Sequence, residues 1–371
     1  MSILSIRPAS WLGMLLPLFV PLAASAGAND VVKQLELPEG FEVSVLTDAV
    51  PGARSLALGS KGTLFVGTRG AGTVYAVRQT AGAAPQVSKI ATSLNSPNGV
   101  AFRDGSLYVA EIHRVVRFDR IEEQLDKPPP PTVVTDKLPG DRHHGWRYIA
   151  FGPDGKLYVP IGAPCNVCDQ KGYAVITRMN ADGTGQENFA SGVRNTVGFT
   201  WHPATRDLWF TDNGRDWLGD DKPPDELNRA PRAGMHFGFP FCHGGTIADP
   251  ELGSLGNCKD AAPPARALGA HVAALGVKFY TGQQFPAEYR NQLLVAEHGS
   301  WNRSERSGYR LMLARLEGNE VRAYEPFVTG WNQSDSVLGR PVDLLVMPDG
   351  SLLVSDDAVG AVYRITYRSG A

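Results

Sequence analysis

The chain has 371 residues, of which 43% are hydrophobic and 20% charged, so it is long enough to bury a large core. Its 36 Lys and Arg against 38 Asp and Glu leave a net charge of −2. This balance argues against a protein that binds nucleic acid or an anionic membrane surface through charge.

The N-terminal segment has the features of a signal peptide. Arg7 supplies a positive charge, residues 11–22 are apolar, and Ala24-Ser25-Ala26 forms an A-x-A cleavage site. Because this apolar run is short and contains two prolines, an uncleaved anchor is the less favoured alternative. We expect cleavage near residue 26, export of residues 27–371 as a single domain, and no transmembrane segment in the mature chain.

One two-strand pattern recurs six times along the mature sequence. Its copies are KGTLFVGT (61–68), DGSLYVAE (104–111), DGKLYVPI (154–161), RDLWFTDN (206–213), NQLLVAEH (291–298) and DGSLLVSD (349–356). An apolar strand precedes each copy, and further strands follow several of them. Repeats of roughly 40–50 residues built from short strands are typical of β-propellers.

The repeats therefore predict an all-β fold, a six-bladed β-propeller of four-stranded antiparallel blades. The early segment FEVSVL (41–46) is expected to close the ring against the last blade. The long interval between the fourth and fifth copies predicts a loop insertion around residues 214–270.

Four cysteines follow the apolar N-terminus, at positions 165, 168, 242 and 258. An even number in an exported chain indicates disulfides. Cys165–Cys168 and Cys242–Cys258 is the simplest pairing, but the spacing leaves the connectivity open. Cys168 is followed by Asp169 rather than His, so there is no c-type haem motif, and no second cysteine pair at ligand spacing supports a zinc site.

Polar side chains just before the first strand of each blade are expected to gather around the central channel. The candidates are Arg54, Asn98, His144, Arg194 with Asn195, His271 and Arg340. This mostly cationic set suits a small anionic ligand, since Arg binds carboxylates through paired hydrogen bonds. The alternative is a set of solvated channel residues with structural hydrogen bonds.

Three shorter motifs add to this set. His143-His144 offers a general base, because the pKa of His lies near neutrality. The acidic stretch 212–228 is rich in hard oxygen ligands and predicts a Ca²⁺ loop, with a solvated loop as the alternative. Trp301-Asn302-Arg303 places an aromatic ring and a cation at one rim, as in a ligand pocket or as rim packing.

Four segments resemble the sorbosone/glucose dehydrogenase family over about residues 35–367. They are HHGWRYIAFGPDGKLYVPIG, SGVRNTVGF, the DNG…DELNR loop with HFGFPFCHGG, and LGRPVDLLVMPDGSLLVSDD. HHGW and GAPCNVC make the sorbosone-dehydrogenase-like branch the more similar one. The resemblance implies a periplasmic or secreted dehydrogenase that uses pyrroloquinoline quinone (PQQ) and Ca²⁺. It implies oxidation of an aldose or sugar aldehyde, with electrons passing to an external quinone or cytochrome.

The resemblance also implies roles for individual residues. His144 is the general base that removes a sugar hydroxyl proton while hydride passes to the quinone. Arg194 and Asn195 contact the reactive quinone oxygens, Arg340 pairs with a PQQ carboxylate, and the backbone carbonyls of Gly214 and Arg215 hold Ca²⁺.

Two positions depart from the family's glucose-oxidising members. Ala163 stands where those members have the Asp that orients the catalytic His, which leaves Asp141 or Asp169 as candidates for that task. The segment EHGSWNRSER lacks their cofactor-binding Lys, which leaves Arg303 as the expected cation. A Ca²⁺-dependent lactonase and a non-catalytic binding propeller are the competing interpretations.

Overall fold

A computed structural model describes residues 27–80, 82–334 and 336–368, and the predicted signal peptide lies outside this part of the chain. Apart from one short α-helix, α1 (Ala28–Val32), and four 3-10 turns, the regular structure in the described residues is β-strand. No helix within these ranges is long and apolar enough to cross a membrane.

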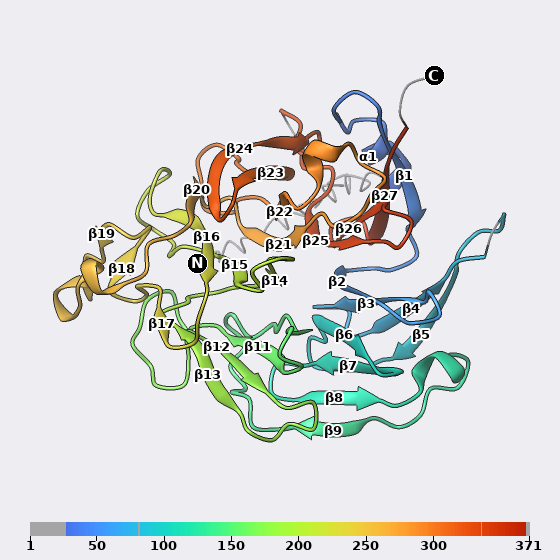
Figure 1. Cartoon of the computed structure of the whole chain (residues 1–371), viewed down its shortest axis with the longest axis horizontal. Coiled ribbons are helices and arrows are strands. Elements are labelled where there is room, and N and C mark those ends of the chain that lie inside the picture. Colours follow the sequence, from blue (N-terminus) through green and yellow to red (C-terminus); the bar gives the residue numbers. More distant parts are fainter. Residues whose placement is uncertain (1–26, 81, 335, 369–371) are drawn as a thin grey trace, which may run out of the picture.

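Six sheets stand around a common axis as the blades of a propeller (Figure 1). The four strands of each blade pair in antiparallel fashion, and the first strands of most neighbouring blades contact one another around the axis. The predicted all-β, six-bladed fold is therefore confirmed.

From the axis outwards, blade one contains β2 (Ala53–Leu58), β3 (Leu64–Thr68), β4 (Val74–Arg78) and β5 (Gln86–Ala91), and blade two contains β6 (Gly99–Arg103), β7 (Ser106–Ala110), β8 (Val115–Phe118) and β9 (Thr132–Thr135). Blade three contains β10 (Ala150–Phe151), β11 (Leu157–Ile161), β12 (Val175–Met179) and β13 (Glu187–Ser191), and blade four contains β14 (Phe199–Trp201), β15 (Leu208–Asp212), β16 (Pro224–Ala230) and β20 (Arg266–Ala270). Blade five contains β21 (Ala274–Phe279), β22 (Leu293–Glu297), β23 (Arg310–Glu317) and β24 (Glu320–Val328), and blade six contains β25 (Pro341–Val346), β26 (Leu352–Asp356), β27 (Ala361–Tyr367) and β1 (Phe41–Thr47).

The hydrophobic core lies between the blades. The strands β3, β11, β22 and β26 are buried along their whole length, because a blade is covered on both faces by its neighbours. One cluster, for example, joins Ala101 and Tyr108 of blade two to Leu157 and Val159 of blade three. Asp-Gly turns allow three of the hairpins to reverse, with Gly105, Gly155 and Gly350 at positive φ, and in blades four and five Arg206 and Asn291 take this conformation.

The N-terminal strand closes the ring. β1 is the outermost strand of blade six and pairs with β27 from Phe41↔Tyr367 onward, as the sequence predicts. Phe41 also contacts the rings of Phe285, Tyr289 and Phe327, with centroids 4.8–5.1 Å apart, so the closure is fixed to blade five as well.

The predicted insertion has narrower bounds than expected. The range 214–270 includes β16 and β20, which are the third and fourth strands of blade four. The added segment runs between them and contains β17 (Met235–His236), β18 (Cys242–His243) and β19 (Ile247–Ala248). It projects from one side of the ring (Figure 1).

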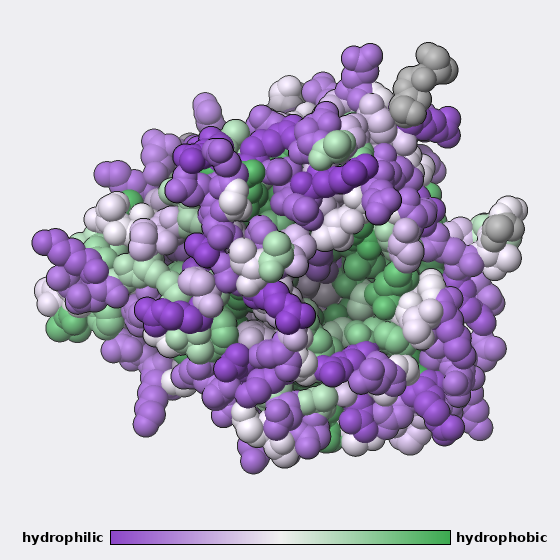
Figure 2. All heavy atoms as spheres, in the orientation of Figure 1, coloured by the Kyte–Doolittle hydropathy of each residue, from purple (hydrophilic) through white to green (hydrophobic). Residues whose placement is uncertain are grey.

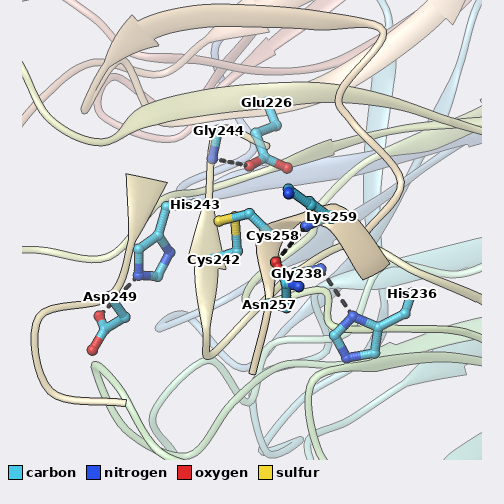
Figure 3. Close-up of a disulfide and its surroundings, with 10 residues drawn as sticks. All are labelled: Glu226, His236, Gly238, Cys242, His243, Gly244, Asp249, Asn257, Cys258 and Lys259. Atoms are coloured by element: carbon cyan, nitrogen blue, oxygen red, sulfur yellow. Dashed lines mark hydrogen bonds and ion pairs between the residues drawn. A yellow bond between two sulfur atoms is a disulfide. The ribbon is translucent and has the colours of Figure 1, made fainter. Parts of the chain in front are cut away.

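Both cysteine pairs form disulfides, Cys165–Cys168 and Cys242–Cys258. The second links β18 to the turn at residues 258–260 and staples the insertion (Figure 3). Beside it, His243 Nε2 lies 2.9 Å from Asp249 Oδ2, and Gly244 N donates to Glu226 Oε1 of β16 at 2.7 Å. The insertion thus contacts blade four through the Gly244–Glu226 hydrogen bond and blade three through β17, which pairs in parallel with β13.

Candidate functional site

One cavity of about 320 Å³ lies at the end of the channel where the chain enters the first strand of each blade. Two sets of loops line it. The first set precedes the first strands, as the sequence predicts, and the second set joins the second strand of a blade to its third. The lining residues used below are Arg54, Arg69, His143, His144, Trp146, Arg194, Asn195, Gly214, Asp216, Asp225, His271, His298, Trp301, Asn302 and Arg340.

His144 lies in the wall of this cavity with only 7% of its surface exposed. Its Nδ1 is 2.8 Å from the carbonyl oxygen of Ala163. Because a carbonyl can only accept, Nδ1 carries the proton and Nε2 keeps its lone pair. Burial, aided by the charge of Arg194, lowers the pKa of His144 to about 2, so the ring is neutral in the cofactor-free protein.

The group that orients His144 is therefore a backbone carbonyl at the position of the missing carboxylate. The suggestion of Asp141 is wrong, because that carboxylate accepts a hydrogen bond from the hydroxyl of Tyr173. Asp169 is also not a partner of His144; its charge acts on His236 instead. The residue type at 163 concealed this contact, since any residue offers the same carbonyl.

Arg194 is buried, and all five of its N–H donors have partners within the protein. Nε donates to Asn166 O at 2.9 Å, and Nη2 donates to Asn166 Oδ1 at 2.8 Å and Asp216 Oδ2 at 3.0 Å. Nη1 donates to Asn213 O at 3.1 Å and Gly214 O at 2.8 Å. The guanidinium thus ties three loops together at the cavity wall and brings a fixed positive charge to it.

Asn166 completes this network from inside the Cys165–Cys168 loop. Its Oδ1 also accepts from Asp216 N at 2.8 Å, and its Nδ2 donates to Asp216 O at 3.2 Å. The short disulfide loop therefore positions the Asn166 side chain, which in turn accepts a hydrogen bond from Arg194. Asn166 was not predicted to have a role, because nothing in the spacing of the cysteines indicates which residue between them forms hydrogen bonds.

We expect Asn166→Ala to lower the free energy of unfolding by about 1–3 kcal/mol, because it leaves a buried charged donor without its acceptor. Urea unfolding followed by fluorescence measures this change. The control is Asn180→Ala in an exposed turn, where Nδ2 donates only to Thr184; equal stability of the two variants would contradict the role of Asn166.

Two buried aspartates at the ends of second strands position the predicted arginines. Asp212 accepts from the backbone N–H groups of Arg194 and Asn195 at 2.8 and 2.6 Å. Asp356 accepts from the backbone N–H of Arg340 at 2.9 Å. Burial raises the pKa of Asp356 to about 6, and that of Asp212 also rises. The same device thus operates in blades four and six.

Three arginines form a cationic cluster at the cavity. Arg54 is buried and donates to Asn98 Oδ1 and Asp357 Oδ2, each at 2.9 Å. Arg340 donates to the carbonyls of His298 and Gly299 at 3.2 and 2.6 Å. Arg69, which the sequence analysis missed, stacks 4.1 Å from the Trp146 ring, and among the described residues its guanidinium has no hydrogen-bond partner. Burial and the charges of Arg54 and Arg340 lower the pKa of Arg69.

Of the histidines that line the cavity, His298 has a carboxylate partner. His298 Nε2 lies 2.8 Å from Asp357 Oδ1, and the other oxygen of Asp357 accepts from Arg54. Burial lowers the pKa of His298 to about 4, despite the opposing effect of Asp357. His298 is thus a competing candidate for the general base, and sequence reasoning gave it no role.

The predicted calcium residues lie beside Arg194. Gly214 lines the cavity, and its carbonyl accepts from Arg194 but keeps a second lone pair. The Arg215 side chain turns into the insertion, where it pairs with Asp249 at 2.6 Å and Glu251 at 2.9 Å. No group of three His, Cys, Asp or Glu side chains in the described ranges is arranged as a metal site. Calcium would therefore need backbone and cofactor oxygens.

The remaining predicted residues divide between the cavity and its support. Asn195 and His271 line the cavity. Asn98 lies behind Arg54 and donates to Arg147 O at 2.8 Å. Arg303 is not among the lining residues: its guanidinium contacts the Asp220 carbonyl and lies 3.7 Å from Asp221, so it braces the acidic loop. Arg69, in the β3–β4 loop of blade one, does line the cavity.

Comparison with known proteins places this geometry in context. A family model described as TrAA12-like matches residues 35–368. An uncharacterized protein of Borreliella burgdorferi is 33% identical over an alignment of 379 positions, which covers 96% of this chain and 97% of that protein. The sorbosone-dehydrogenase-like branch stays a prediction.

Several solved structures share the fold, with 20% sequence identity and an alignment that covers 90% of this chain. The holo PQQ domain of pyranose dehydrogenase from Coprinopsis cinerea has a TM-score of 0.75 and is covered to 97%. A calcium structure of a family AA12 enzyme of Trichoderma reesei has a TM-score of 0.76 and is covered to 97%. The PQQ-bound aldose sugar dehydrogenase of Streptomyces coelicolor has a TM-score of 0.64 and is covered to 100%.

Proposed function

Since the chain belongs to the TrAA12-like family, we propose that it is an exported, PQQ-dependent dehydrogenase that oxidises an aldose or sugar aldehyde. One observation carries the proposal: a neutral, oriented histidine and a cluster of arginines share a single cavity. A base for a hydroxyl proton and a receptor for an anion are the two parts that this reaction requires.

The cavity fits PQQ in charge. PQQ is a planar anion with three carboxylates, and the wall presents Arg54, Arg69 and Arg340 together. Arg69 has donors to spare, and the mutual repulsion of the cluster favours an anion between them. Trp146 adds a flat apolar surface that stacks on Arg69 and meets the His144 ring edge-on at 5.9 Å.

The chain's own residues supply orientation and proton transfer. His144 Nε2 accepts the proton of the hydroxyl on the carbon that is oxidised, and the Ala163 carbonyl stabilises the imidazolium that forms. The nearby guanidinium of Arg194 stabilises negative charge that develops at the cavity wall. PQQ, when bound, supplies the two-electron acceptor. The electrons then pass to an external quinone or cytochrome.

Export agrees with the two disulfides, which persist in oxidising compartments. The lactonase interpretation requires carboxylate ligands around a channel metal. Asp216 and Asp225 do line the cavity, but Asp216 is bonded to Arg194 and Asn302, and Asp225 to two backbone N–H groups. Their engagement supports the dehydrogenase reading over the lactonase.

Titration of the purified cofactor-free protein with PQQ, followed by dye reduction with a panel of aldoses and sugar aldehydes, tests the function. We expect saturable PQQ binding and turnover of at least one sugar. Failure to bind PQQ would overturn the proposal and favour the lactonase or the non-catalytic propeller. Binding without turnover of any sugar would retain the cofactor but refute the substrate class.

The same titration in Ca²⁺ and in EGTA tests the second cofactor. We propose that the Gly214 and Arg215 carbonyls would hold Ca²⁺, which would supply a Lewis acid near the bound cofactor, so that EGTA weakens PQQ binding at least tenfold, about 1.4 kcal/mol. Equal affinity in both buffers would show that Arg194 alone supplies the positive charge at the Gly214 carbonyl.

A further inference from the structure

Two tryptophans are exposed side by side at the rim of the cavity. Trp217 and Trp301 expose 68% and 64% of their surfaces. Their ring centroids are 5.3 Å apart with the planes at 89°, and Trp301 also lines the cavity. The other large hydrophobic residues exposed to this degree in the described ranges, Val133 and Leu255, are not part of such a pair. Solvation of two adjacent indoles is unfavourable unless something covers them.

The loops that carry the two rings are held in place. Asn302 Nδ2, next to Trp301, donates to Asp216 Oδ1, next to Trp217, at 3.1 Å. Asp216 is also bonded to the buried Arg194. Trp217 has a φ of 69°, a left-handed conformation that a bulky residue adopts only when its surroundings impose it. The unfavourable backbone conformation of Trp217 is therefore maintained by its surroundings, and it places the side chain at this point.

We propose that Trp217 and Trp301 form a binding site for a pyranose ring, which stacks its apolar C–H face on one indole. The negative face of an indole attracts polarised C–H groups, and the second indole at a right angle closes a corner around the sugar. Two side chains suit one sugar ring, but they are too few for a protein partner, which buries about 800 Å² on each side.

This inference rests on the proposed function and specifies its substrate class. The reacting carbon must reach His144 inside the cavity, whereas the tryptophan pair lies at the rim with two thirds of its surface exposed. The cavity of about 320 Å³ is at the lower end of the range for ligand pockets, about 300–1,000 Å³, and under the proposed function it must hold both PQQ and the reacting ring. The ring held by the tryptophans is therefore the next one along, and the substrate is a disaccharide or longer saccharide.

The test compares glucose with cellobiose, maltose and lactose, first by calorimetric binding to the cofactor-free and PQQ-loaded protein. We expect Trp217→Ala and Trp301→Ala to raise the dissociation constant of at least one disaccharide about tenfold, in line with the energy of aromatic contacts plus lost area. The affinity for glucose should change less than about twofold in Trp217→Ala, because Trp217 is outside the cavity lining. Leu255→Ala is the control, because it removes an equally exposed apolar side chain from the insertion.

Each outcome has one meaning. Equal weakening for glucose and disaccharides would overturn the proposal by placing the reacting ring at the tryptophans. Unchanged affinities, or no binding of any disaccharide, would also overturn it. A higher KM for the electron acceptor alone would assign the pair to acceptor docking instead. Tryptophan-dependent binding without dye reduction would uphold the sugar site while refuting the dehydrogenase.

Discussion

Replacement of His144 by Gln is expected to lower kcat by about 10²–10⁴-fold, the usual contribution of a general base, and to leave PQQ affinity within about threefold. The side chain is oriented by the Ala163 carbonyl and lines the cavity, but it is not part of the arginine cluster that attracts the anion. Gln preserves volume and hydrogen bonding, so the loss reports proton transfer rather than a cavity. Dye-reduction kinetics and a PQQ titration measure the two quantities.

His298→Gln is the matched comparison, because His298 lines the same cavity and has the carboxylate partner that His144 lacks. If His144 is the base, its variant loses kcat while the His298 variant mainly loses PQQ affinity through the disturbed Asp357–Arg54 pair. The reverse pattern would transfer the role of base to the His298–Asp357 pair.

The pH profile of the wild type gives a separate test of His144. A histidine with a depressed pKa is active when neutral and loses activity as pH falls through that pKa. The pKa of His144 is lowered from 6.5 to about 2 by burial and cations, and an anionic cofactor raises it again by offsetting Arg194. The acidic limb of kcat/KM is therefore expected between these values, and it should disappear in the His144 variant.

Much of the fold was predictable because the blade hairpin repeats in the sequence. Each copy alternates an apolar strand, a tight turn and a second apolar strand, and burial between blades requires this composition six times. Ring closure by residues 41–46 was also predictable, because an early strand can complete the last blade of a propeller and so join the two ends of the chain. The bounds of the insertion did not, because β16 and β20 lack the turn signal that marks the other strands.

The candidate site was predictable only in part, for a geometric reason. Residues before the first strand of each blade were expected at the channel, and His144, Arg194, Asn195, His271 and Arg340 do line the cavity. The loops between second and third strands open at the same end of the ring, and they supply Arg69, Asp216, His298 and Trp301. Sequence reasoning used this second set only at residues 214–215 and 301–303, so it missed the Arg69 contact and the His298–Asp357 pair.

Figure 2 shows hydrophilic atoms over most of the face viewed in Figure 1, with hydrophobic atoms exposed toward the middle of the ring. Hydrophilic residues are thus spread over this face, whereas the arginines proposed to bind an anion, Arg54, Arg69 and Arg340, line one cavity. Composition alone cannot distinguish the arginines that line the cavity from the other basic residues, because the 36 Lys and Arg of the chain nearly balance its acidic residues.

Arg69→Gln and Arg340→Ala are each expected to weaken PQQ binding by about 10–150-fold, the value of one charged hydrogen bond of about 1.5–3 kcal/mol. Arg69 has unused donors at the cavity, and Arg340 is held there by backbone carbonyls. Arg232→Ala, at an exposed position outside the cavity lining, is the control and should not change the affinity.

The free energy of unfolding distinguishes an arginine of this cluster that binds the ligand from one that stabilises the fold. Arg69 is solvent-exposed, and among the described residues its guanidinium has no hydrogen-bond partner, so the fold of the cofactor-free protein depends little on it. Arg69→Gln should therefore leave the free energy of unfolding within about 0.5 kcal/mol. Arg54→Ala should instead destabilise the protein by about 3–5 kcal/mol, because Arg54 is buried and paired with Asp357. If the Arg69 variant destabilised the protein as much as the Arg54 variant while PQQ bound equally well, Arg69 would be structural and the cavity would need a different ligand.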